Sequence, residues 1–444
     1  MTAGHLSPSE VVAGALDRLD RTEPDIQAWV RVDRTGALES ARQLDAAPLG
    51  GLLHGIPFGV KDIIDVRGLP TECGSPLRRG RVADSDAPLI ARLRRLGAIP
   101  LGKTVTTEFA YFAPGPTRNP HGLSHTPGGS SSGSAAAVAA GVVPLALGSQ
   151  TAGSLTRPAA YCGVAGLVAA VGGPLDTAGF VGLSHRLDAV GLLTQTVADL
   201  RLAYLAMTGA DRLPDPVGPP EHPKLAVWSG TELAEISGDM REALTRTADD
   251  AVANGAVLVD IDWPALTPRL VESHATVMGY EACRALAEEG THPEQLSAPL
   301  NDLLTHGRSI TAQDYRRALS EAEQARAGIL DLLTDVDAIL GPAAPGVAPK
   351  GLGATGSPVL SRPWQLLGLP ALTVPGHRDG QGMPLGLQLL GHPDRMERLF
   401  ALGHALETAA RAVQTIRPIA IHSARDIPDH VPLARRELPK IKPA

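Results

Sequence analysis

The stretch from Thr126 to Val164 reads TPGGSSSGSAAAVAAGVVPLALGSQTAGSLTRPAAYCGV, and two serine-rich glycine turns flank an apolar segment within it. The glycines beside Ser130–Ser132 free the backbone for a close approach to a ligand. We predict a short Ala-rich helix after this turn, capped by one of its serines and ended by Gly141. A buried strand over 142–147 then leads to the second turn, Ser149–Ser154, whose amides are free to bind an oxyanion.

The composition is that of a soluble globular protein, since 43% of the 444 residues are hydrophobic and 20% are charged. The net charge is −7 and no stripe of Lys and Arg alternates with aromatic residues, which argues against a nucleic-acid partner. The longest apolar run, residues 135–147, is too short to cross a bilayer, and no signal peptide is apparent. The cysteines Cys73, Cys162 and Cys283 form no C-x-x-C pair, so we expect a reducing, cytoplasmic environment.

Strand and helix patterns alternate along the chain and predict an α/β fold. Strands are expected at 55–60, 99–101, 142–147, 225–228, 256–261, 336–340 and 385–390, and amphipathic helices at 87–96, 240–254, 312–333 and 396–413. The length permits either several domains or one large domain. We predict one domain over 1–413, with a core at about 55–210 and a second half at about 222–413. The proline-rich residues 414–444 are predicted to form a surface arm.

The expected strand at 55–60 ends at Lys61, a place where α/β proteins often put reactive side chains. A lysine takes a proton from a hydroxyl only in its neutral form. Lowering its pKa from about 10.4 to near 7 requires roughly 4 to 5 kcal/mol, which burial beside an apolar strand can supply. A lysine at a strand end is more often a solvated surface charge, so this position alone leaves both interpretations open.

Two other motifs compete for the chemistry. Residues 97–104, GAIPLGKT, match the Walker A pattern, but a helix precedes them and the variable positions form a strand, so we reject a phosphate loop. Residues 129–133, GSSSG, match the G-x-S-x-G nucleophile turn, but no apolar strand leads directly into them, and we keep this as a weaker alternative. His121 and His125 lack a nearby third ligand, so we predict no metal or cofactor.

Several motifs in order make the chain recognisable. They are GIPFGVKDIID at 55–65, the serine-rich turn at 128–134, SQTAGSLTRPAAYCG at 149–163 and, toward the C-terminus, Gly341-Pro342, Gly368-Leu-Pro370, LTVP at 372–375 and PLGLQ at 384–388. Over about residues 5–412 the chain resembles the amidase signature family, most closely its malonamidase-like members. This resemblance implies an α/β/α sandwich around a central mixed, mostly parallel twisted sheet.

The resemblance also implies a Ser-Ser-Lys triad, with Lys61 as base, Ser130 after a cis peptide bond as proton relay and Ser154 as nucleophile. The implied oxyanion donors are the amides of Thr151, Ala152, Gly153 and Ser154. In the malonamidase-like pattern Arg157 faces the substrate, where its planar fork suits a carboxylate. Bracing of the loop by Arg157 is the alternative. Further residues assigned to substrate binding are Gln150, Ser131 and Gly129.

We therefore predict an amidase that hydrolyses the C–N bond of a small carboxylic amide, such as malonamate, through an acyl-enzyme. The expected partners are this substrate and a second copy in a homodimer, with no nucleic acid or membrane. The alternatives are a glutaminase subunit of a tRNA-dependent amidotransferase and a non-catalytic relative. The chain departs from the family at Val168-Ala169-Ala170, where Lys-Pro is usual, and this puts the loop geometry around the substrate in doubt.

Overall fold

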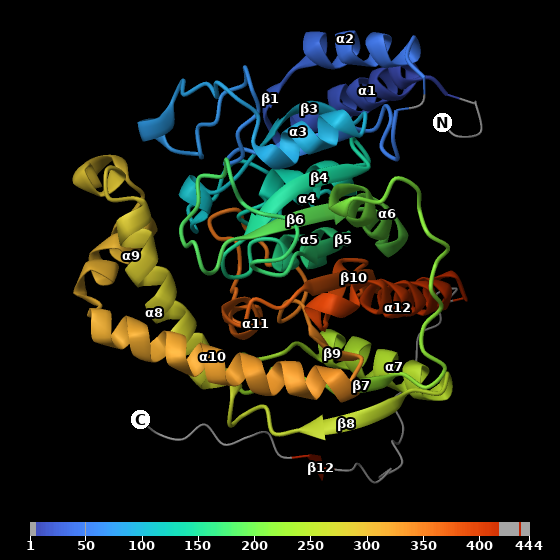
Figure 1. Cartoon of the computed structure of the whole chain (residues 1–444), viewed down its shortest axis with the longest axis vertical. Coiled ribbons are helices and arrows are strands. Elements are labelled where there is room, and N and C mark those ends of the chain that lie inside the picture. Colours follow the sequence, from blue (N-terminus) through green and yellow to red (C-terminus); the bar gives the residue numbers. More distant parts are fainter. Residues whose placement is uncertain (1–5, 49, 417–434, 437–444) are drawn as a thin grey trace.

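The computed structural model describes residues 6–48, 50–416 and 435–436. Its centre is one twisted sheet that runs the length of the molecule, from β1 at one end to β8 and β12 at the other (Figure 1). The strands are β1 (Trp29–Val32), β2 (Pro57–Lys61), β3 (Ile99–Thr104), β4 (Leu145–Gln150), β5 (Ala165–Val168), β6 (Ala189–Thr194), β7 (Lys224–Val227), β8 (Val257–Ile261), β9 (Ala338–Pro342), β10 (Ala371–Arg378), β11 (Pro384–Leu390) and β12 (Arg435–Arg436).

Helices pack against this sheet and cover it. They are α1 (Pro8–Ile26), α2 (Arg34–Asp45), α3 (Pro88–Arg95), α4 (Ser132–Ala139), α5 (Thr156–Cys162), α6 (Val197–Thr208), α7 (Gly238–Ala253), α8 (Thr267–Ala285), α9 (Ala298–Ser309), α10 (Ala312–Asp335), α11 (Arg362–Leu366) and α12 (Met396–Ile416). The helices α8, α9 and α10 contact one another and form a group at one side of the molecule (Figure 1). The α/β class is as predicted.

The strand order is β1-β3-β2-β4-β6-β5-β10-β11-β9-β7-β8-β12. The predicted mixed sheet is confirmed, but the expectation of mostly parallel pairing needs correction. Six neighbouring pairs are antiparallel and five are parallel, the parallel ones lying on the two flanks. The reason is local, because the short connection from β10 to β11 can only make an antiparallel pair and β6 inserts antiparallel between β4 and β5.

Strands on both sides of the proline-rich connection at 214–223 belong to this one sheet, although the division of the chain into domains stays a prediction. The helix α12 continues to Ile416, three residues past the predicted end of the domain. Of the predicted arm, 417–434 and 437–444 lie outside the described residues. In the part of the chain that the structure describes, no helix is long and apolar enough to span a membrane.

The predicted helix and strand around Gly141 exist, with shifted limits. Ser131 precedes α4 but its side chain does not cap the helix. Gly141 adopts a left-handed φ of 70°, and the Val142 amide donates a hydrogen bond back to Ala137 O, so residues 142–143 close the helix instead of starting the strand. The strand β4 therefore begins at Leu145 and extends to Gln150. This extension carries buried backbone directly into the second serine turn.

The helix α4 packs so closely on the sheet that only glycine fits at position 133. A Cβ at Gly133 would lie 2.1 Å from Ala28 O and 2.4 Å from Val105 N, both backbone atoms. We predict that Gly133→Ala lowers the free energy of unfolding by about 3 kcal/mol, because the backbone just before β1 and just after β3 would have to move. Denaturant unfolding measures this. Gly14→Ala is the control, since a Cβ at Gly14 in α1 meets nothing within 4 Å.

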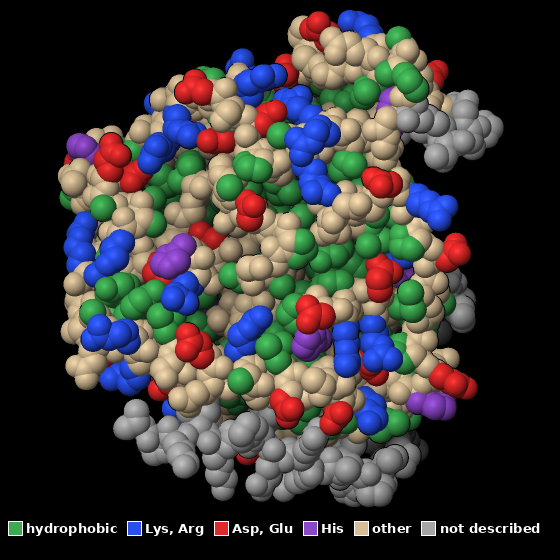
Figure 2. All heavy atoms as spheres, in the orientation of Figure 1, with side chains coloured by type: hydrophobic (Ala, Val, Ile, Leu, Met, Phe, Trp, Pro, Cys, Tyr) green, Lys and Arg blue, Asp and Glu red, His purple; other side chains and the backbone are tan. Residues whose placement is uncertain are grey.

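The face shown in Figure 2 carries acidic and basic side chains interspersed with apolar ones, rather than gathered by sign. The three cysteines are unpaired, and Cys73 and Cys162 are buried.

Candidate active site

The two serine turns meet at one edge of the sheet. The strands β2 and β4 are parallel neighbours, so their carboxyl ends, at Lys61 and Gln150, lie at the same edge. The first turn comes against this edge because it leads into α4, which packs on both strands. The Ser131 amide donates a hydrogen bond to Ser154 O at 3.0 Å and joins the two turns directly.

Lys61 is fully buried and bonded to two hydroxyls. Its Nζ donates to Ser130 Oγ at 2.6 Å and to Ser149 Oγ at 2.9 Å. Burial lowers the pKa of Lys61 to about 7, while the negative charge of Asp188 raises it. An amine with this pKa is partly neutral near pH 7, so it can hold or release a proton at Ser130. The surface interpretation of this lysine is therefore excluded.

Ser130 and Ser154 line the same pocket, together with residues 151–153 and Arg157. Ser130 is 2% exposed and Ser154 is 8% exposed, so both hydroxyls lie at the inner end of the pocket. The peptide bond between Gly129 and Ser130 is cis, as the family resemblance implies. The structure therefore places Lys61 against Ser130, and Ser130 and Ser154 on the lining of one pocket.

The amides of Thr151, Ala152, Gly153 and Ser154 are unused by the fold. No described residue accepts a hydrogen bond from any of these four N–H groups. Since the turn lines the pocket, its free donors can bind a negatively charged oxygen there.

Three residues assigned to substrate binding lie behind the pocket wall. Gln150 Oε1 accepts hydrogen bonds from the amides of Leu155 and Thr156 at 3.0 Å, which fixes the start of α5. Ser131 Oγ bonds to the backbone of β4 at 3.3 Å. A Cβ at Gly129 would lie 2.7 Å from Thr355 Cγ2, so glycine is needed for close packing. These residues are not among those that line the pocket, and the contacts they make hold the turns, so their role in substrate binding stays a prediction.

Arg157 faces the pocket from the first turn of α5 and is 3% exposed. Its Nη2 donates to Gly129 O at 2.6 Å and to Thr355 Oγ1 at 3.2 Å, so it does brace the first turn. Its Nε and Nη1 have no hydrogen-bond partner among the described residues. Burial lowers its pKa only to about 10, so it stays positively charged at pH 7. A buried guanidinium with two unpaired N–H donors beside the pocket is suited to bind an anion.

The remaining pocket walls are apolar and come from distant parts of the chain: Tyr111, Phe112, Leu183, Met278 and Pro358. The aromatic wall starts at Glu108, whose buried carboxylate accepts hydrogen bonds from two other segments. The non-glycine residues that follow have left-handed backbone at Phe109, Ala110 and Phe112, with φ of 44°, 60° and 34°. Such conformations persist where surrounding contacts fix them, so we infer that the fold holds this aromatic wall in place.

The departure from the family at Val168 lies away from this pocket. Val168 is buried in β5, where it pairs with Gly191 of β6 and Ala371 of β10. None of residues 168–170 lines the pocket that holds Ser154. The expected disturbance around the substrate is therefore not found there.

The rejected motifs also have structural explanations. Lys103 of the Walker-like stretch is fully buried. It donates to Thr71 Oγ1 at 2.8 Å and Pro70 O at 2.9 Å and forms an ion pair with Asp62 at 3.0 Å, so its charge is already paired inside the fold. His121 bonds to Cys162 O at 3.0 Å. Within the described residues no group of three His, Cys, Asp or Glu side chains is placed to hold a metal ion.

A family model described as Amidase matches residues 10–400. The chain belongs to the amidase family. Among solved relatives, a crystal structure of an amidase is 31% identical, with a TM-score of 0.82 over 92% of this chain and 97% of that one. The peptide amidase of Stenotrophomonas maltophilia is 29% identical, with a TM-score of 0.78 over 93% and 95%. This amidase is therefore a hydrolase of C–N amide bonds.

Another relative of this amidase has a different role. It is one subunit of the glutamyl-tRNA(Gln) amidotransferase of Staphylococcus aureus strain Mu3, and it is 29% identical over 91% of this chain and 94% of its own length. The relatives thus include proteins described as amidases and a subunit of an amidotransferase, and family membership alone does not separate these two roles.

Sequence reasoning missed three residues of this amidase site. Ser149 provides the second hydroxyl bonded to Lys61. Its place at the start of the second serine turn could have indicated this contact. Asp188 and His274 both contact Thr151, from just before β6 and from α8. Nothing in the sequence near Thr151 indicates either, because both contacts depend on the tertiary fold.

Proposed function

We propose that this amidase hydrolyses a small amide that carries a carboxylate, through a covalent ester on Ser154. The proposal is carried by one observation, the 2.6 Å hydrogen bond from a buried Lys61 to Ser130, because this pair can take up a proton near neutral pH.

In the proposed reaction Ser154 Oγ attacks the amide carbonyl carbon and its proton passes to Ser130 Oγ, whose own proton passes to the Lys61 amine. The amides of residues 151–154 hold the resulting oxyanion. When the intermediate collapses, the C–N bond breaks and the nitrogen receives the proton from Ser130, which Lys61 replaces. Water then attacks the Ser154 ester by the same relay and releases the acid. Each step is neutral in protons, and ammonia or an amine leaves first.

The acyl group is expected to be short and to carry a carboxylate. The support for this is the unpartnered Nε and Nη1 of Arg157 at the pocket. Besides burial, the positive charge of Arg362 also lowers the pKa of Arg157. Malonamate and glutamine both fit this description, and the malonamidase likeness stays a prediction. The homodimer and the cytoplasmic location also stay predictions.

The purified chain should release ammonia from such an amide without any partner. Malonamate, glutamine and a neutral aryl amide are assayed separately by coupled ammonia or amine detection. Turnover of malonamate or glutamine with little activity on the neutral aryl amide supports the proposal. Silence on all three would contradict a free-standing amidase and favour the second candidate, a glutaminase component of a tRNA-dependent amidotransferase. The similarity to the Staphylococcus aureus amidotransferase component over 91% of the chain is the observation that favours that candidate.

Arg157→Lys should weaken carboxylate-bearing substrates selectively, because lysine keeps the charge but loses the planar fork. We expect kcat/KM for malonamate to fall about 30-fold, from the loss of one charge-assisted hydrogen bond. Activity on 4-nitrophenyl acetate, which has no carboxylate, should fall by less than about threefold. Steady-state kinetics on both substrates measures the split, and equal losses would refute the recognition role.

A further inference from the structure

Thr151, the first residue of the free-amide turn, is held from two sides by groups outside that turn. Its Oγ1 donates a hydrogen bond to Asp188 Oδ1 at 2.5 Å. Its carbonyl oxygen lies 2.8 Å from His274 Nε2. The four amides of the turn have no partners among the described residues. These two contacts therefore help to fix where the N–H groups point, together with Gln150 and the bond from the Ser131 amide to Ser154 O.

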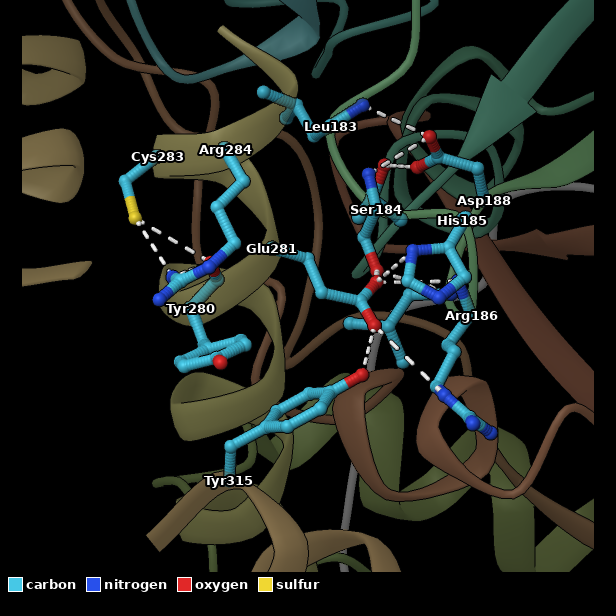
Figure 3. Close-up of polar contacts among 12 residues, drawn as sticks. Leu183, Ser184, His185, Arg186, Asp188, Tyr280, Glu281, Cys283, Arg284 and Tyr315 are labelled. Carbon is cyan, nitrogen blue, oxygen red and sulfur yellow. Dashed lines mark hydrogen bonds and ion pairs between the residues drawn. The ribbon is translucent and has the colours of Figure 1, made fainter. Parts of the chain in front are cut away.

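Asp188 joins the turn to the pocket wall. Its second oxygen, Oδ2, accepts hydrogen bonds from the amides of Leu183 at 2.8 Å and Ser184 at 3.0 Å (Figure 3). Leu183 itself lines the pocket. A Cβ at Gly182 would lie 2.2 Å from Asp188 Oδ2, so glycine there permits the carboxylate to fold back on the loop. Burial raises the pKa of Asp188, while its three hydrogen-bond donors and the nearby charge of Lys61 act in the opposite direction.

His274 approaches the same residue from α8. It is fully buried, and burial together with the positive charge of Arg362 lowers its pKa to about 3. The ring is therefore neutral near pH 7. Since its Nε2 faces a carbonyl oxygen, that nitrogen carries the proton and donates. Its Nδ1 has no partner in the described part of the chain, so the bond to Thr151 O is the one hydrogen bond that the ring makes there.

A second contact ties α8 back to the loop before β6. Glu281, near the end of α8, accepts hydrogen bonds from Ser184 Oγ and from the hydroxyl of Tyr315 in α10 (Figure 3). The Arg186 amide donates to the same carboxylate at 3.2 Å. The contacts form a closed ring that runs from Thr151 through Asp188, the loop and α8, and returns through His274. A closed ring resists displacement of any one member.

We propose that Asp188 and His274 are positioning residues that together fix Thr151, and through it the oxyanion-binding amides. This proposal rests on the proposed function, in which those amides hold the oxyanion. Donors aimed at a developing charge lose effect when they move by a fraction of an ångström. Removing either contact should therefore lower kcat and leave KM nearly unchanged, because the amides act on the transition state rather than on the bound substrate.

Asp188 has a second measurable effect, on the proton affinity of Lys61. The negative charge of Asp188 raises the pKa of Lys61. Asp62, the carboxylate next to Lys61 in the sequence, is instead paired with Lys103. The other groups facing Lys61 are the uncharged hydroxyls of Ser130 and Ser149. Asp188→Asn keeps the shape but removes the charge, so the pKa of Lys61 should fall further. The acid limb of the pH profile should move to lower pH, which a purely structural role would not cause.

The test uses the full chain and 4-nitrophenyl acetate, an acyl donor that does not depend on Arg157. The variants are His274→Leu, His274→Gln, Asp188→Ala and Asp188→Asn. Two exposed positions serve as controls: Glu272→Gln in α8 and Asp176→Asn in the loop before β6. Circular dichroism and thermal melting identify variants that do not fold, and active-site titration normalises the rest. Gln is chosen because its amide nitrogen can replace His Nε2 as donor.

We expect His274→Leu and Asp188→Ala to lower kcat by about 10- to 100-fold with KM changed by less than about threefold. His274→Gln should recover most of the loss, and Asp188→Asn should shift the acid limb downward. Wild-type kcat in both His274→Leu and Asp188→Ala, a loss confined to KM, or an unmoved acid limb in Asp188→Asn would overturn the proposal. Full activity of Ser154→Ala in the same assay would instead overturn the proposed function.

Discussion

Ser154→Ala is expected to lower kcat by about 10⁴-fold or more, since it removes the only atom to which the acyl group can bond in the proposed reaction. The fold should persist, because Ser154 contributes a backbone carbonyl, and no side-chain contact, to the link between the two serine turns. Ammonia release and a melting curve together measure this. Substantial remaining turnover would end the assignment of Ser154.

The matched control is Ser124→Ala. Ser124 is an exposed serine of the same chain whose hydroxyl, among the described residues, bonds only to its neighbour His125, at 3.3 Å. This variant should keep wild-type turnover. A loss in both variants would indicate damage to the fold rather than to the nucleophile.

Lys61→Ala is expected to lower kcat by about 10³-fold, which is a usual contribution of a general base. In the wild type the base must be neutral. The pKa of Lys61 is lowered to about 7, so activity should rise with pH through about 7 and level off above it. In Lys61→Ala this acid limb should disappear, because no group with that pKa remains in the relay.

A pH series of kcat/KM from 5 to 9 on both proteins measures the effect. An acid limb that persists unchanged in the variant would assign the titration to another group. Lys61→Met, which keeps the apolar stem, separates the loss of the amine from the loss of packing, and it should behave as Lys61→Ala does.

Local patterns in the sequence predicted the parts of the site that lie on single elements. The apolar run before Lys61 indicated a buried strand end, and the lysine is indeed fully buried there. The glycine-rich turns predicted free backbone donors, and those amides are unpaired in the described structure. Both patterns depend on a few adjacent residues, which is why they could be read from the sequence. The apolar residues before Lys61 predict a buried strand, and the small side chains at 151–154 predict a turn with free amides.

Contacts between distant elements could not be predicted in this way. Gln150 seemed a substrate residue because it adjoins the oxyanion turn, yet its side chain points back to start α5 and bonds to Gln365 at 2.9 Å. Asp188 and His274 reach Thr151 only because the tertiary fold inserts β6 beside β4 and brings α8 against the second serine turn. The strand β6 was itself missed, and with it the antiparallel centre of the sheet.

The most direct test of the triad is the site of covalent labelling by a fluorophosphonate, mapped by peptide mass spectrometry. The account predicts one adduct, on Ser154, in the wild type at pH 8, and its near absence in Lys61→Ala. Ser130 should stay unlabelled in both, since its hydroxyl relays a proton and forms no ester. An adduct on Ser130, or equal labelling of Ser154 with and without the lysine, would contradict the account. A chain that takes no label at all would be the non-catalytic relative.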